Sequence, residues 1–459
     1  MPLSRITDCA RNSRCAIAAS GRATVVWLAV AMIATAHEPM DADGLLGVSL
    51  AAAIWLVALR AAAARAPYAL GSTTPAAIGS TAGLVGVAAL NPYMPGMQFS
   101  LSSLLAMAAG IFVTSAIWED VLDRTAKRRV LVVGSGAVAD LQEAALRSGH
   151  LSFDMVAAEP DSDPQDGSSS HLNPLDLAPI VEAQRPDLIV LADEHSCSDA
   201  VERLLDITDR RFRVVGLTTF YEYAFGSVPV RRMTPMWFMS LMHVRQRAPR
   251  RPSKRLFDIV VSIVGLMVFA LLLPIFALLV KATPGPLIYR QVRVGERGRR
   301  FTMYKLRTMS AAAEAECGAV FAQQSDPRCT AAGRVLRKTH LDELPQLWNV
   351  LKGDMSIVGP RPERPEHIQM LEDGVPYWSR RLLLKPGLTG WAQVQCGYTD
   401  DCASAAEKLS HDFWYMRHGN LAIDVAVCLQ TVRLALDALS PRQLWLRAAG
   451  GATREHALR

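Results

Sequence analysis

The sequence predicts a membrane protein of mixed architecture with three parts: an N-terminal four-helix transmembrane domain, a Rossmann-like α/β domain, and a C-terminal α/β domain with a re-entrant membrane helix. Three observations predict this architecture. Four apolar stretches open the chain, a strand with a glycine turn follows them, and a later apolar stretch lies between two basic segments. These changes in composition place the domains at 1–127, 128–244 and 245–459.

Composition limits the partners that the chain can have. Half of the 459 residues are hydrophobic, and the net charge is +6. Nearly every basic cluster lies beside an apolar stretch, which suits the phosphates of membrane lipids or of phosphorylated substrates. The sequence has no zinc-finger spacing, so we expect no nucleic-acid partner. The eight cysteines form no C-x-x-C motif, and we expect reduced cytoplasmic thiols.

The charges between the first apolar stretches predict four membrane spans with both ends in the cytoplasm. The stretches occupy 23–36, 44–64, 69–90 and 100–118. Basic and non-basic links alternate between them, and the links at 37–43 and 91–99 carry no Lys or Arg. Lys and Arg concentrate in cytoplasmic loops, so these two links are expected on the outer side. A buried all-α core would not require this alternation.

The middle of the chain is typical of a nucleotide-binding fold. Residues 128–149 read as a buried strand, a glycine turn and a helix, and Gly134 to Ala139 fit the pattern G-x-G-x-x-G/A. Further strands are expected at 186–193 and 212–218. The pattern Y-x-x-x-K, the usual catalytic pair of short-chain nucleotide-sugar oxidoreductases, does not occur in the sequence. We therefore expect a structural or regulatory domain rather than a redox enzyme.

The apolar stretch at 256–280 is expected to enter the membrane and return to the same side. It is long enough to span a bilayer, but the segments before and after it, 245–255 and 281–300, are both strongly basic. Pro274 interrupts the helical hydrogen bonding inside the stretch. A re-entrant helix keeps both basic flanks in the cytoplasm, and a plain fifth span is the alternative.

Two adjacent carboxylates, Asp342 and Glu343, follow in the segment 337–363 between Arg337 and Arg361. An acidic residue at a helix N-terminus is ordinarily a stabilising cap. The same pair between cations can also form a catalytic centre. The preceding segment, 285–309, alternates as a basic β-hairpin and projects cations that suit phosphate groups.

From residue 254 to 436 the chain resembles the bacterial sugar transferase family, the polyprenyl-phosphate glycosylphosphotransferases or monotopic phosphoglycosyl transferases. The resemblance rests on the following motifs, in the family's order: KRLFDIVVSIVGL, GPLIYRQVRVG, YKLRTM, LDELPQLWNVLKGDMSIVGPRPE, KPGLTGWAQV and EKLSHDFWYMRHGNLAIDVAVCLQTV. The parts before residue 254 resemble the long-chain branch that initiates exopolysaccharide or O-antigen repeat units.

The resemblance implies transfer of a hexose 1-phosphate, with glucose or galactose expected, from a UDP-sugar to undecaprenyl phosphate with release of UMP. It implies that Asp342 is the nucleophile and forms a covalent aspartyl intermediate, that Glu343 assists, and that both carboxylates hold Mg²⁺. Four basic residues are expected to bind substrate phosphate: Arg337, Arg361, Lys305 and Arg307. The enzyme would be a multi-pass protein of the bacterial inner membrane with its catalytic domain on the cytoplasmic face.

Further expectations concern partners and alternatives. A homodimer is compatible with the N-terminal domains, and downstream glycosyltransferases of the same pathway would be functional partners. Two other functions compete: a non-catalytic membrane scaffold for polysaccharide assembly and an NAD-dependent nucleotide-sugar enzyme. We expect Cys396 and Cys402 to be ordinary thiols, and His367 and His411 to be packing or surface residues. Residues after Lys254 are expected to suffice for the reaction.

Overall fold

The structure, a computed structural model, divides into two compact units, Met1–Gly226 and Ser227–Arg459, and each is described by itself. It describes residues 13–35, 42–65, 73–93, 99–125, 128–134, 141–142, 144–145, 153–158, 177–192, 212–233, 237–241, 252–309, 328–396 and 402–438. Most of the predicted link at 37–43, residues 94–98 of the predicted link at 91–99, most of the glycine motif and most of 245–255 lie outside these residues.

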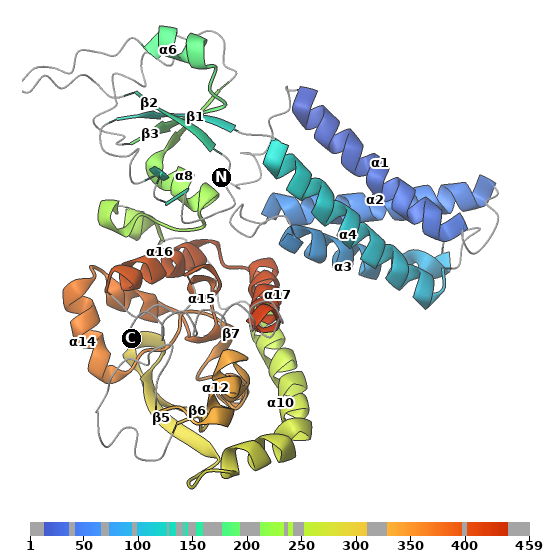
Figure 1. Ribbon diagram of the computed structural model, residues 1–459. Helices are drawn as coiled ribbons and strands as arrows, with labels where there is room; N and C mark the ends of the chain where they lie inside the picture. Colours follow the sequence, from blue (N-terminus) through green and yellow to red (C-terminus); the bar gives the residue numbers. More distant parts are fainter. Residues whose placement is uncertain are drawn as a thin grey trace, which may run out of the picture. The chain divides into compact units, whose positions relative to one another are not determined.

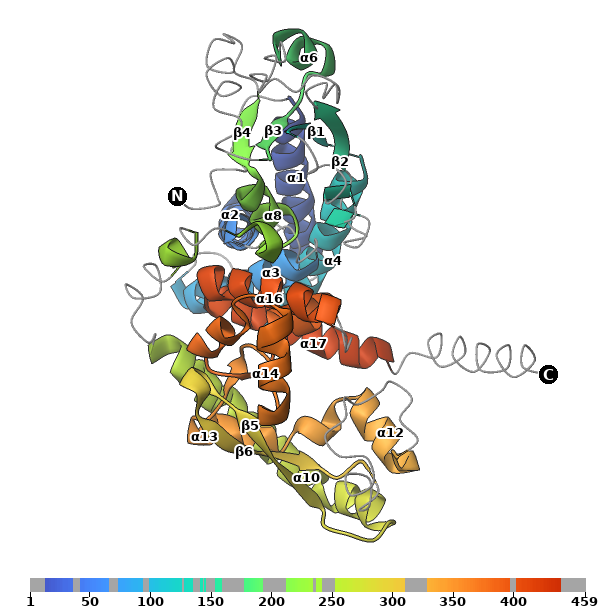
Figure 2. The same cartoon turned by 90° about the vertical axis from the view of Figure 1, so that its left-hand side faces the viewer.

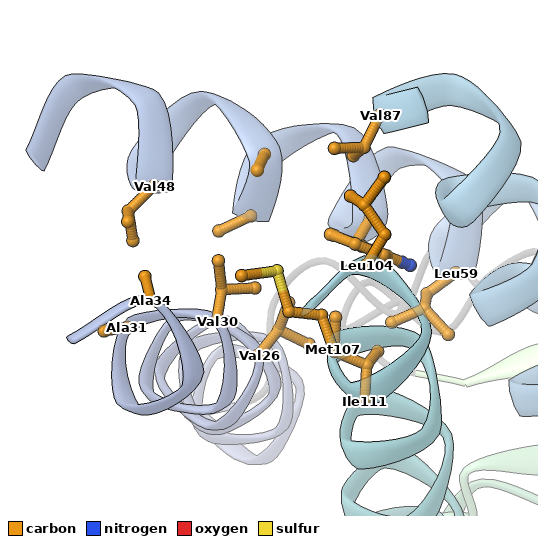
Figure 3. Close-up of a cluster of buried hydrophobic side chains, with 13 residues drawn as sticks. Val26, Val30, Ala31, Ala34, Val48, Leu59, Val87, Leu104, Met107 and Ile111 are labelled. Atoms are coloured by element: carbon orange, nitrogen blue, oxygen red, sulfur yellow. The ribbon is translucent and has the colours of Figure 1, made fainter. Parts of the chain in front are cut away.

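The first unit begins with four helices that coincide with the four predicted apolar stretches. They are α1 (Ser13–Thr35), α2 (Ala42–Arg65), α3 (Thr73–Leu90) and α4 (Leu101–Thr125) (Figure 1). Runs rich in Ala and Leu favour helix in these segments. Helix α2 contacts α3, and α4 contacts both α1 and α3. Their shared core contains Val30, Val48, Leu104 and Met107, all of which point into one cluster (Figure 3).

Small residues in α3 allow α2 to approach closely. A Cβ atom at Gly83 would collide with the ring of Trp55, and one at Gly79 would lie 2.7 Å from the Leu59 backbone. The buried Trp55 indole also donates to the Ser80 carbonyl oxygen at 3.0 Å. Close packing over glycine is a common way for membrane helices to associate, because lipid gives them little hydrophobic drive to do so. Gly79 and Gly83 therefore allow α3 to pack closely against α2.

Both units contain helices that are long and apolar enough to cross a membrane. Among the described residues, three helical segments are long and apolar enough to cross a membrane: Leu45–Ala62, Leu101–Trp118 and Pro252–Lys281. The helices Gly21–Ala34 and Pro75–Leu90 are apolar but shorter. A membrane location fits this composition, whereas the four-span topology stays a prediction.

A four-stranded parallel sheet with the order β2-β1-β3-β4 follows the helices. Its strands are β1 (Arg128–Val133), β2 (Phe153–Ala158), β3 (Leu188–Leu191) and β4 (Arg213–Gly216), with α6 (Leu177–Gln184) before β3 and α8 (Leu217–Ala224) after β4. Buried aliphatic side chains on β1 and β3 pack against α8. Parallel strands covered by helices are the architecture that the sequence pattern predicts.

Gly134 ends β1 in a conformation that a larger residue would resist. Its φ angle is +118°, and a Cβ there would lie 2.7 Å from the Cβ of Ala192. The first glycine of the predicted motif is thus required by the tight turn at the end of the strand. The remaining motif residues, through Ala139, lie outside the described residues, so nucleotide binding stays untested.

The second unit holds a long helix, a hairpin, a small parallel strand pair and several short helices. Its elements are α10 (Pro252–Lys281), β5 (Ile288–Val294), β6 (Arg300–Leu306), α12 (Ala331–Lys338), η6 (Leu341–Glu343), α13 (Gln346–Lys352), β7 (Ser356–Val358), α14 (Pro365–Gly374), η7 (Trp378–Leu383), β8 (Gly387–Thr389), α15 (Trp391–Cys396), α16 (Cys402–His418) and α17 (Leu421–Ala438). The β5–β6 hairpin is antiparallel, as predicted, and it lies beside the C-terminal part of α10 (Figures 1 and 2).

Helix α10 exposes most of its apolar side chains and bends in its C-terminal part (Figure 1). Pro274 lies in this part, and a proline inside a helix removes one hydrogen bond and clashes with the preceding turn. An exposed apolar helix is expected only where lipid or another apolar surface covers it. The bend is compatible with the predicted re-entrant course, which stays a prediction.

The N-terminal end of α10 is fixed to the rest of its unit by polar side chains. Lys254 pairs with Asp424 at 2.9 Å. Arg255 donates to the carbonyl oxygens at the end of α13 at 2.7 Å each. The buried carboxylate of Asp258, the one charge inside the apolar stretch, accepts hydrogen bonds of 3.0 Å from the Ser356 hydroxyl and the Ile357 amide. These contacts explain why a charged residue is tolerated near the start of an apolar helix.

The segment just after Gly226 packs with the C-terminal unit. This unit therefore begins at Ser227, before the predicted domain boundary at residue 245. The Val228 amide donates to the Ser410 carbonyl oxygen at 3.2 Å. The Phe238 ring stacks on Tyr377 at 6.0 Å and lies 6.1 Å from the fully buried Phe413. The sequence around this segment shows no apolar periodicity long enough to assign it to either neighbour.

We predict that a fragment of residues 227–459 unfolds at a higher temperature than a fragment of residues 250–459. The shorter fragment loses Phe238 and exposes Phe413, and burying one Phe side chain is worth about 1.5–3 kcal/mol. Thermal unfolding of both fragments in the same detergent measures the difference. Phe238→Ala in the longer fragment should reproduce much of the loss, and equal unfolding temperatures for the two fragments would contradict the prediction.

Candidate active site

The acidic pair lies in η6, a short 3-10 turn between α12 and α13. His340 precedes it with φ +58°, a left-handed conformation that is uncommon for residues other than glycine. Its amide donates to the Arg337 carbonyl oxygen at 3.3 Å, and its own carbonyl accepts from the Glu343 amide at 3.1 Å. The Asp342 and Glu343 side chains are both buried as a result. Such strained residues gather at functional sites.

Hydrophobic contacts hold this turn on the apolar helix α10. Leu341 and Leu344, on either side of the acidic pair, pack against a cluster that includes Phe276 and Val280 of α10. The same cluster contains Leu336 of α12. The two carboxylates are thereby held at the C-terminal half of the helix that is expected to enter the membrane.

Glu343 pairs with two cations that come from different parts of the chain. Its Oε1 atom lies 3.2 Å from Nζ of Lys305 and 2.9 Å from Nη2 of Arg361. Its Oε2 atom accepts a longer bond of 3.5 Å from Nη1 of Arg361. A buried carboxylate is costly unless it is paired with a cation. The two ion pairs therefore stabilise the buried Glu343, and they also fix Lys305 and Arg361 beside the acidic turn.

Asn349 places Lys305 within reach of Glu343. It lies on α13 and is fully buried. Its side chain donates to the Thr302 carbonyl oxygen at 2.7 Å and accepts from the Tyr304 amide at 3.2 Å. These two bonds clamp strand β6 to α13 one residue before the lysine. Asn349 was not singled out from the sequence, although it belongs to the motif LPQLWNVLKGD.

The glycines of the GPRP and KPGLTG motifs place Arg361. Strands β7 and β8 pair in parallel, and the Gly359 amide continues the pairing by donating to the Thr389 carbonyl oxygen at 2.9 Å. The Gly387 amide donates to the Pro360 carbonyl oxygen at 2.9 Å. A Cβ on either glycine would collide with the opposite backbone. Only glycine permits this approach, which directs the residue after Pro360 toward the acidic turn.

Asp342 differs from its neighbour because no cation holds it directly. Within the described residues, its carboxylate accepts no hydrogen bond and forms no ion pair, although it is only 6% exposed. Burial raises the pKa of Asp342 to about 6, and the adjacent Glu343 charge acts in the same direction. Lys305, Arg337 and Arg361 oppose that rise.

The pKa values of the other ionisable groups of the site are shifted by burial and by neighbouring charges. Burial alone would raise the pKa of Glu343, but Arg361 and Lys305 together lower it well below its usual range. Burial lowers the pKa of the Lys305 ammonium and of the His340 imidazole, against the attraction of Glu343. Two adjacent carboxyls with pKa values pushed in opposite directions are typical of catalytic sites.

A second layer of charge supports Arg361 from behind. The buried Arg381 donates to the Arg361 carbonyl oxygen at 3.2 Å and pairs with Asp412 at 2.8 Å and Glu363 at 3.5 Å. Its guanidinium also lies 4.4 Å from the centre of the Trp378 ring. Burial raises the pKa of Asp412 to about 6, against the effect of Arg381. The motif EKLSHDFWY contains Asp412, so the resemblance held a signal that the sequence analysis did not use.

Arg293 is a further cation that sequence reasoning did not assign to the site. It lies on β5 and donates to the Pro362 carbonyl oxygen at 3.0 Å and to the Gln291 side chain at 2.6 Å. Burial and the like charge of Arg361 lower the pKa of Arg293 to about 10. The alternation of side chains along the hairpin could have identified Arg293. It lies on the same face of the β5–β6 pair as Lys305.

The predicted phosphate-binding residues divide into two groups. Lys305 and Arg361 contact Glu343, and Arg337 lowers the pKa of Asp342 while its guanidinium lies 2.8 Å from the Cys329 sulfur. Arg307 contacts neither carboxylate and donates instead to carbonyl oxygens at the end of α10, so its predicted binding of substrate phosphate stays a prediction.

Arg307 caps the C-terminal end of α10. Its buried guanidinium donates to the carbonyl oxygens of Val280 at 2.9 Å, Thr283 at 2.7 Å and Pro284. Gly285, with φ +127°, leaves the room for this side chain. Carbonyl oxygens at a helix C-terminus have no partner within the helix, and a cation satisfies them well. The residue therefore joins the end of α10 to the segment that follows β6.

The acidic turn fits Mg²⁺ as an open site. Asp342 presents a buried carboxylate without a protein partner, and Glu343 presents a second one whose Oε2 atom is less engaged than Oε1. Mg²⁺ prefers oxygen ligands and is usually held by one or two carboxylates together with substrate phosphates. The cations nearby would oppose a metal ion by itself, so the fit requires a phosphate-bearing ligand.

Comparison with known proteins identifies the region that carries this site. The bacterial sugar transferase family profile matches residues 249–438. The chain is 40% identical over 208 residues to the UDP-N-acetylgalactosamine-undecaprenyl-phosphate N-acetylgalactosaminephosphotransferase of Aeromonas hydrophila, which covers 44% of this chain and 49% of that protein. The match therefore spans about half the length of the Aeromonas relative.

Two further relatives match more of the chain. The undecaprenyl-phosphate galactose phosphotransferase of Salmonella typhimurium is 31% identical over 342 residues, which is 68% of each chain. The UDP-glucose:undecaprenyl-phosphate glucose-1-phosphate transferase of Escherichia coli is 32% identical over 314 residues, which is 67% of each chain. With the family profile and these relatives together, the chain belongs to the bacterial sugar transferase family.

Proposed function

We propose that this protein transfers a sugar 1-phosphate from a UDP-sugar to undecaprenyl phosphate, releases UMP, and thereby initiates the synthesis of a surface polysaccharide such as an exopolysaccharide or O-antigen. The single observation that carries the proposal is the arrangement at the acidic turn. A buried, unpaired Asp342 lies beside a Glu343 that fixes Lys305 and Arg361, and the turn is seated on an exposed apolar helix. The family and the names of the relatives support the same reaction.

In the first half of the reaction, an oxygen of Asp342 attacks the phosphorus that carries the sugar. A P–O bond to Asp342 forms, the bond from this phosphorus to the UMP oxygen breaks, and UMP leaves with the electron pair. A carboxylate can approach a dianionic diphosphate only if the repulsion between them is reduced. Lys305 and Arg361 reduce it, and they also stabilise charge on the equatorial oxygens of the transferring phosphoryl group.

In the second half, an oxygen of undecaprenyl phosphate attacks the same phosphorus and releases the Asp342 carboxylate. The acceptor is a membrane lipid, so its phosphate reaches the site only if the site lies at the membrane surface. The contact of Leu341 and Leu344 with Phe276 and Val280 provides this proximity. The charge on Glu343 stays in place throughout because its pKa is low.

Mg²⁺ would be held by Asp342 and Glu343 together with the diphosphate, where it would neutralise phosphate charge. The covalent intermediate and the metal are both inferred from the donor groups and the family resemblance. We also infer that the chain is a multi-pass protein of the bacterial inner membrane with the acidic turn on the cytoplasmic side, where UDP-sugars are made. The relatives act on different sugars, and glucose or galactose is our proposal for the donor.

Asp342→Asn should abolish transfer, with a loss of about a thousandfold or more, because an amide is not a nucleophile toward phosphorus. The measurement is transfer of radiolabelled sugar from a UDP-sugar panel into an organic phase, with UMP release as a second readout. Asp373→Asn on the exposed face of α14 is the matched control and should keep normal activity. Near-normal turnover by Asp342→Asn at unchanged membrane yield would refute the nucleophile assignment.

Removal of divalent metal should stop the reaction. We expect transfer to disappear in EDTA and to return when Mg²⁺ is added in excess, because the diphosphate charge is then neutralised again. UMP release measured before and after metal addition tests this. Full activity in the chelator would remove the metal from the mechanism and leave the neutralisation to basic side chains such as Lys305 and Arg361.

The pH dependence of kcat/KM should show one acidic limb that belongs to Asp342. The reactive form is the ionised carboxylate, and its pKa in the free protein is raised to about 6. Activity should therefore rise with pH up to about 6, falling about tenfold per pH unit below that value, and then level off.

Glu343→Gln should shift this limb to lower pH. The substitution removes the neighbouring negative charge that raises the pKa of Asp342, while Lys305 and Arg361 remain to lower it. Residual activity should be severely reduced, since the two cations lose their anchor. The shape of the pH profile is independent of that reduction, and an unshifted limb would show that Asp342 is not the titrating group.

A further inference from the structure

A cluster of three metal-ligating side chains lies outside the acidic turn. Within the described part of the chain, Cys396, Glu407 and His411 form the one group of three or more such side chains whose ligand atoms all lie within 4.8 Å of one another. Cys396 ends α15, and the other two lie four residues apart on α16. Residues at this spacing share one helix face, so α16 presents a carboxylate and an imidazole together toward the thiol of α15.

We propose that Cys396, Glu407 and His411 form a binding site for a zinc-type transition-metal ion that cross-links α15 to α16. Thiolate and imidazole ligands select borderline-soft ions such as Zn²⁺, whereas Mg²⁺ prefers oxygen ligands alone. With Cys396 as thiolate, Glu407 ionised and His411 neutral, the three ligands balance the charge of a divalent ion, and the thiol proton passes to solvent on binding. Three protein ligands leave the fourth tetrahedral position for water.

The geometry requires only a small closure. With bond lengths of about 2.0–2.3 Å, ligand atoms around tetrahedral zinc lie about 3.3–3.8 Å apart, so atoms within 4.8 Å must approach by at most about 1.5 Å. None of the three residues is without an interaction in the metal-free structure.

Aromatic packing already holds the two helices together at this point. The buried Trp391 of α15 lies 4.8 Å from the Trp414 ring and 6.4 Å from the His411 ring of α16. The ligands are thus brought together by a rigid contact rather than by mobile side chains. His411 is buried, which shields its metal bond from water.

The site is connected to the acidic turn through neighbouring residues. Asp412, next to His411, pairs with Arg381, which in turn donates to the Arg361 carbonyl oxygen. A metal ion at the α15–α16 contact would stiffen the helix that carries Asp412. Its role is structural, and it takes no part in the proposed transfer chemistry.

The test uses the full chain in detergent after removal of metals, titrated with Co²⁺. We expect a single equivalent to produce a thiolate-to-cobalt charge-transfer band in the near ultraviolet and the visible bands of tetrahedral cobalt, and Zn²⁺ to abolish both. Mg²⁺ should produce neither band and should not compete. No substrate is present, so failure of this test leaves the proposed transfer reaction untouched. Absence of the charge-transfer band in the wild type would overturn the proposal.

Matched variants assign the site. Cys396→Ser should abolish the charge-transfer band, and Glu407→Gln or His411→Asn should weaken binding at least tenfold. Cys428→Ser, which removes a half-buried thiol of α17, is the control and should keep the band. A band that survives Cys396→Ser would show adventitious binding to other thiols and would overturn the assignment.

Two measurements remain informative if a variant folds poorly. In the wild type, Zn²⁺ at a hundredfold excess over its Kd should raise the unfolding temperature by about 5 °C or more. Zn²⁺ should also slow alkylation of Cys396 by iodoacetamide, followed by mass spectrometry of its peptide, but not alkylation of Cys428. Equal alkylation of Cys396 with and without Zn²⁺ would contradict the proposal.

Discussion

The pairing of the buried Glu343 carboxylate with Lys305 and Arg361 is the interaction on which the rest of the C-terminal unit depends. It joins three segments that are distant in sequence: the turn that holds the acidic pair, strand β6, and the loop after β7. A buried carboxylate without these partners would be strongly destabilising. Because both cations pair with Glu343, the adjacent Asp342 has no direct partner, and burial together with the Glu343 charge raises its pKa.

This division of roles gives two adjacent acidic residues different chemistry. Glu343 pairs with the two cations, whereas Asp342 is buried without a direct partner and is the residue that we propose to be reactive. Uncharged residues position these cations. Asn349 bonds to the backbone of β6, and Gly359 and Gly387 allow close approach of the backbone segments that follow β7 and form β8. A phosphate that enters the site meets cations that are already in position, so little reorganisation accompanies its binding.

Helix α10 is joined at both ends to the elements that surround the acidic turn. Lys254 and its pair Asp424 fix the first turns, and Arg307 satisfies the carbonyl oxygens at the last turn. Between these points, apolar side chains of α10 carry the acidic turn. A lipid phosphate acceptor is confined to the membrane surface, so the proposed reaction would benefit from an acidic turn carried directly by an apolar helix.

The sequence by itself determined the apolar helices, the parallel strands, the basic hairpin and, through the family resemblance, the acidic pair with Arg361 and Lys305. These features follow from local hydrophobic pattern or from motifs whose residues are neighbours along the chain. Tertiary structure alone decided the rest. Arg307 reads from sequence like the nearby Lys305, but Lys305 on β6 contacts Glu343, whereas Arg307, just after β6, contacts helix carbonyl oxygens. Likewise, the segment around Phe238 joins the C-terminal unit through aromatic partners more than a hundred residues away. A long side chain or an isolated aromatic ring carries no periodic signal, so its partner is set only when distant elements pack together.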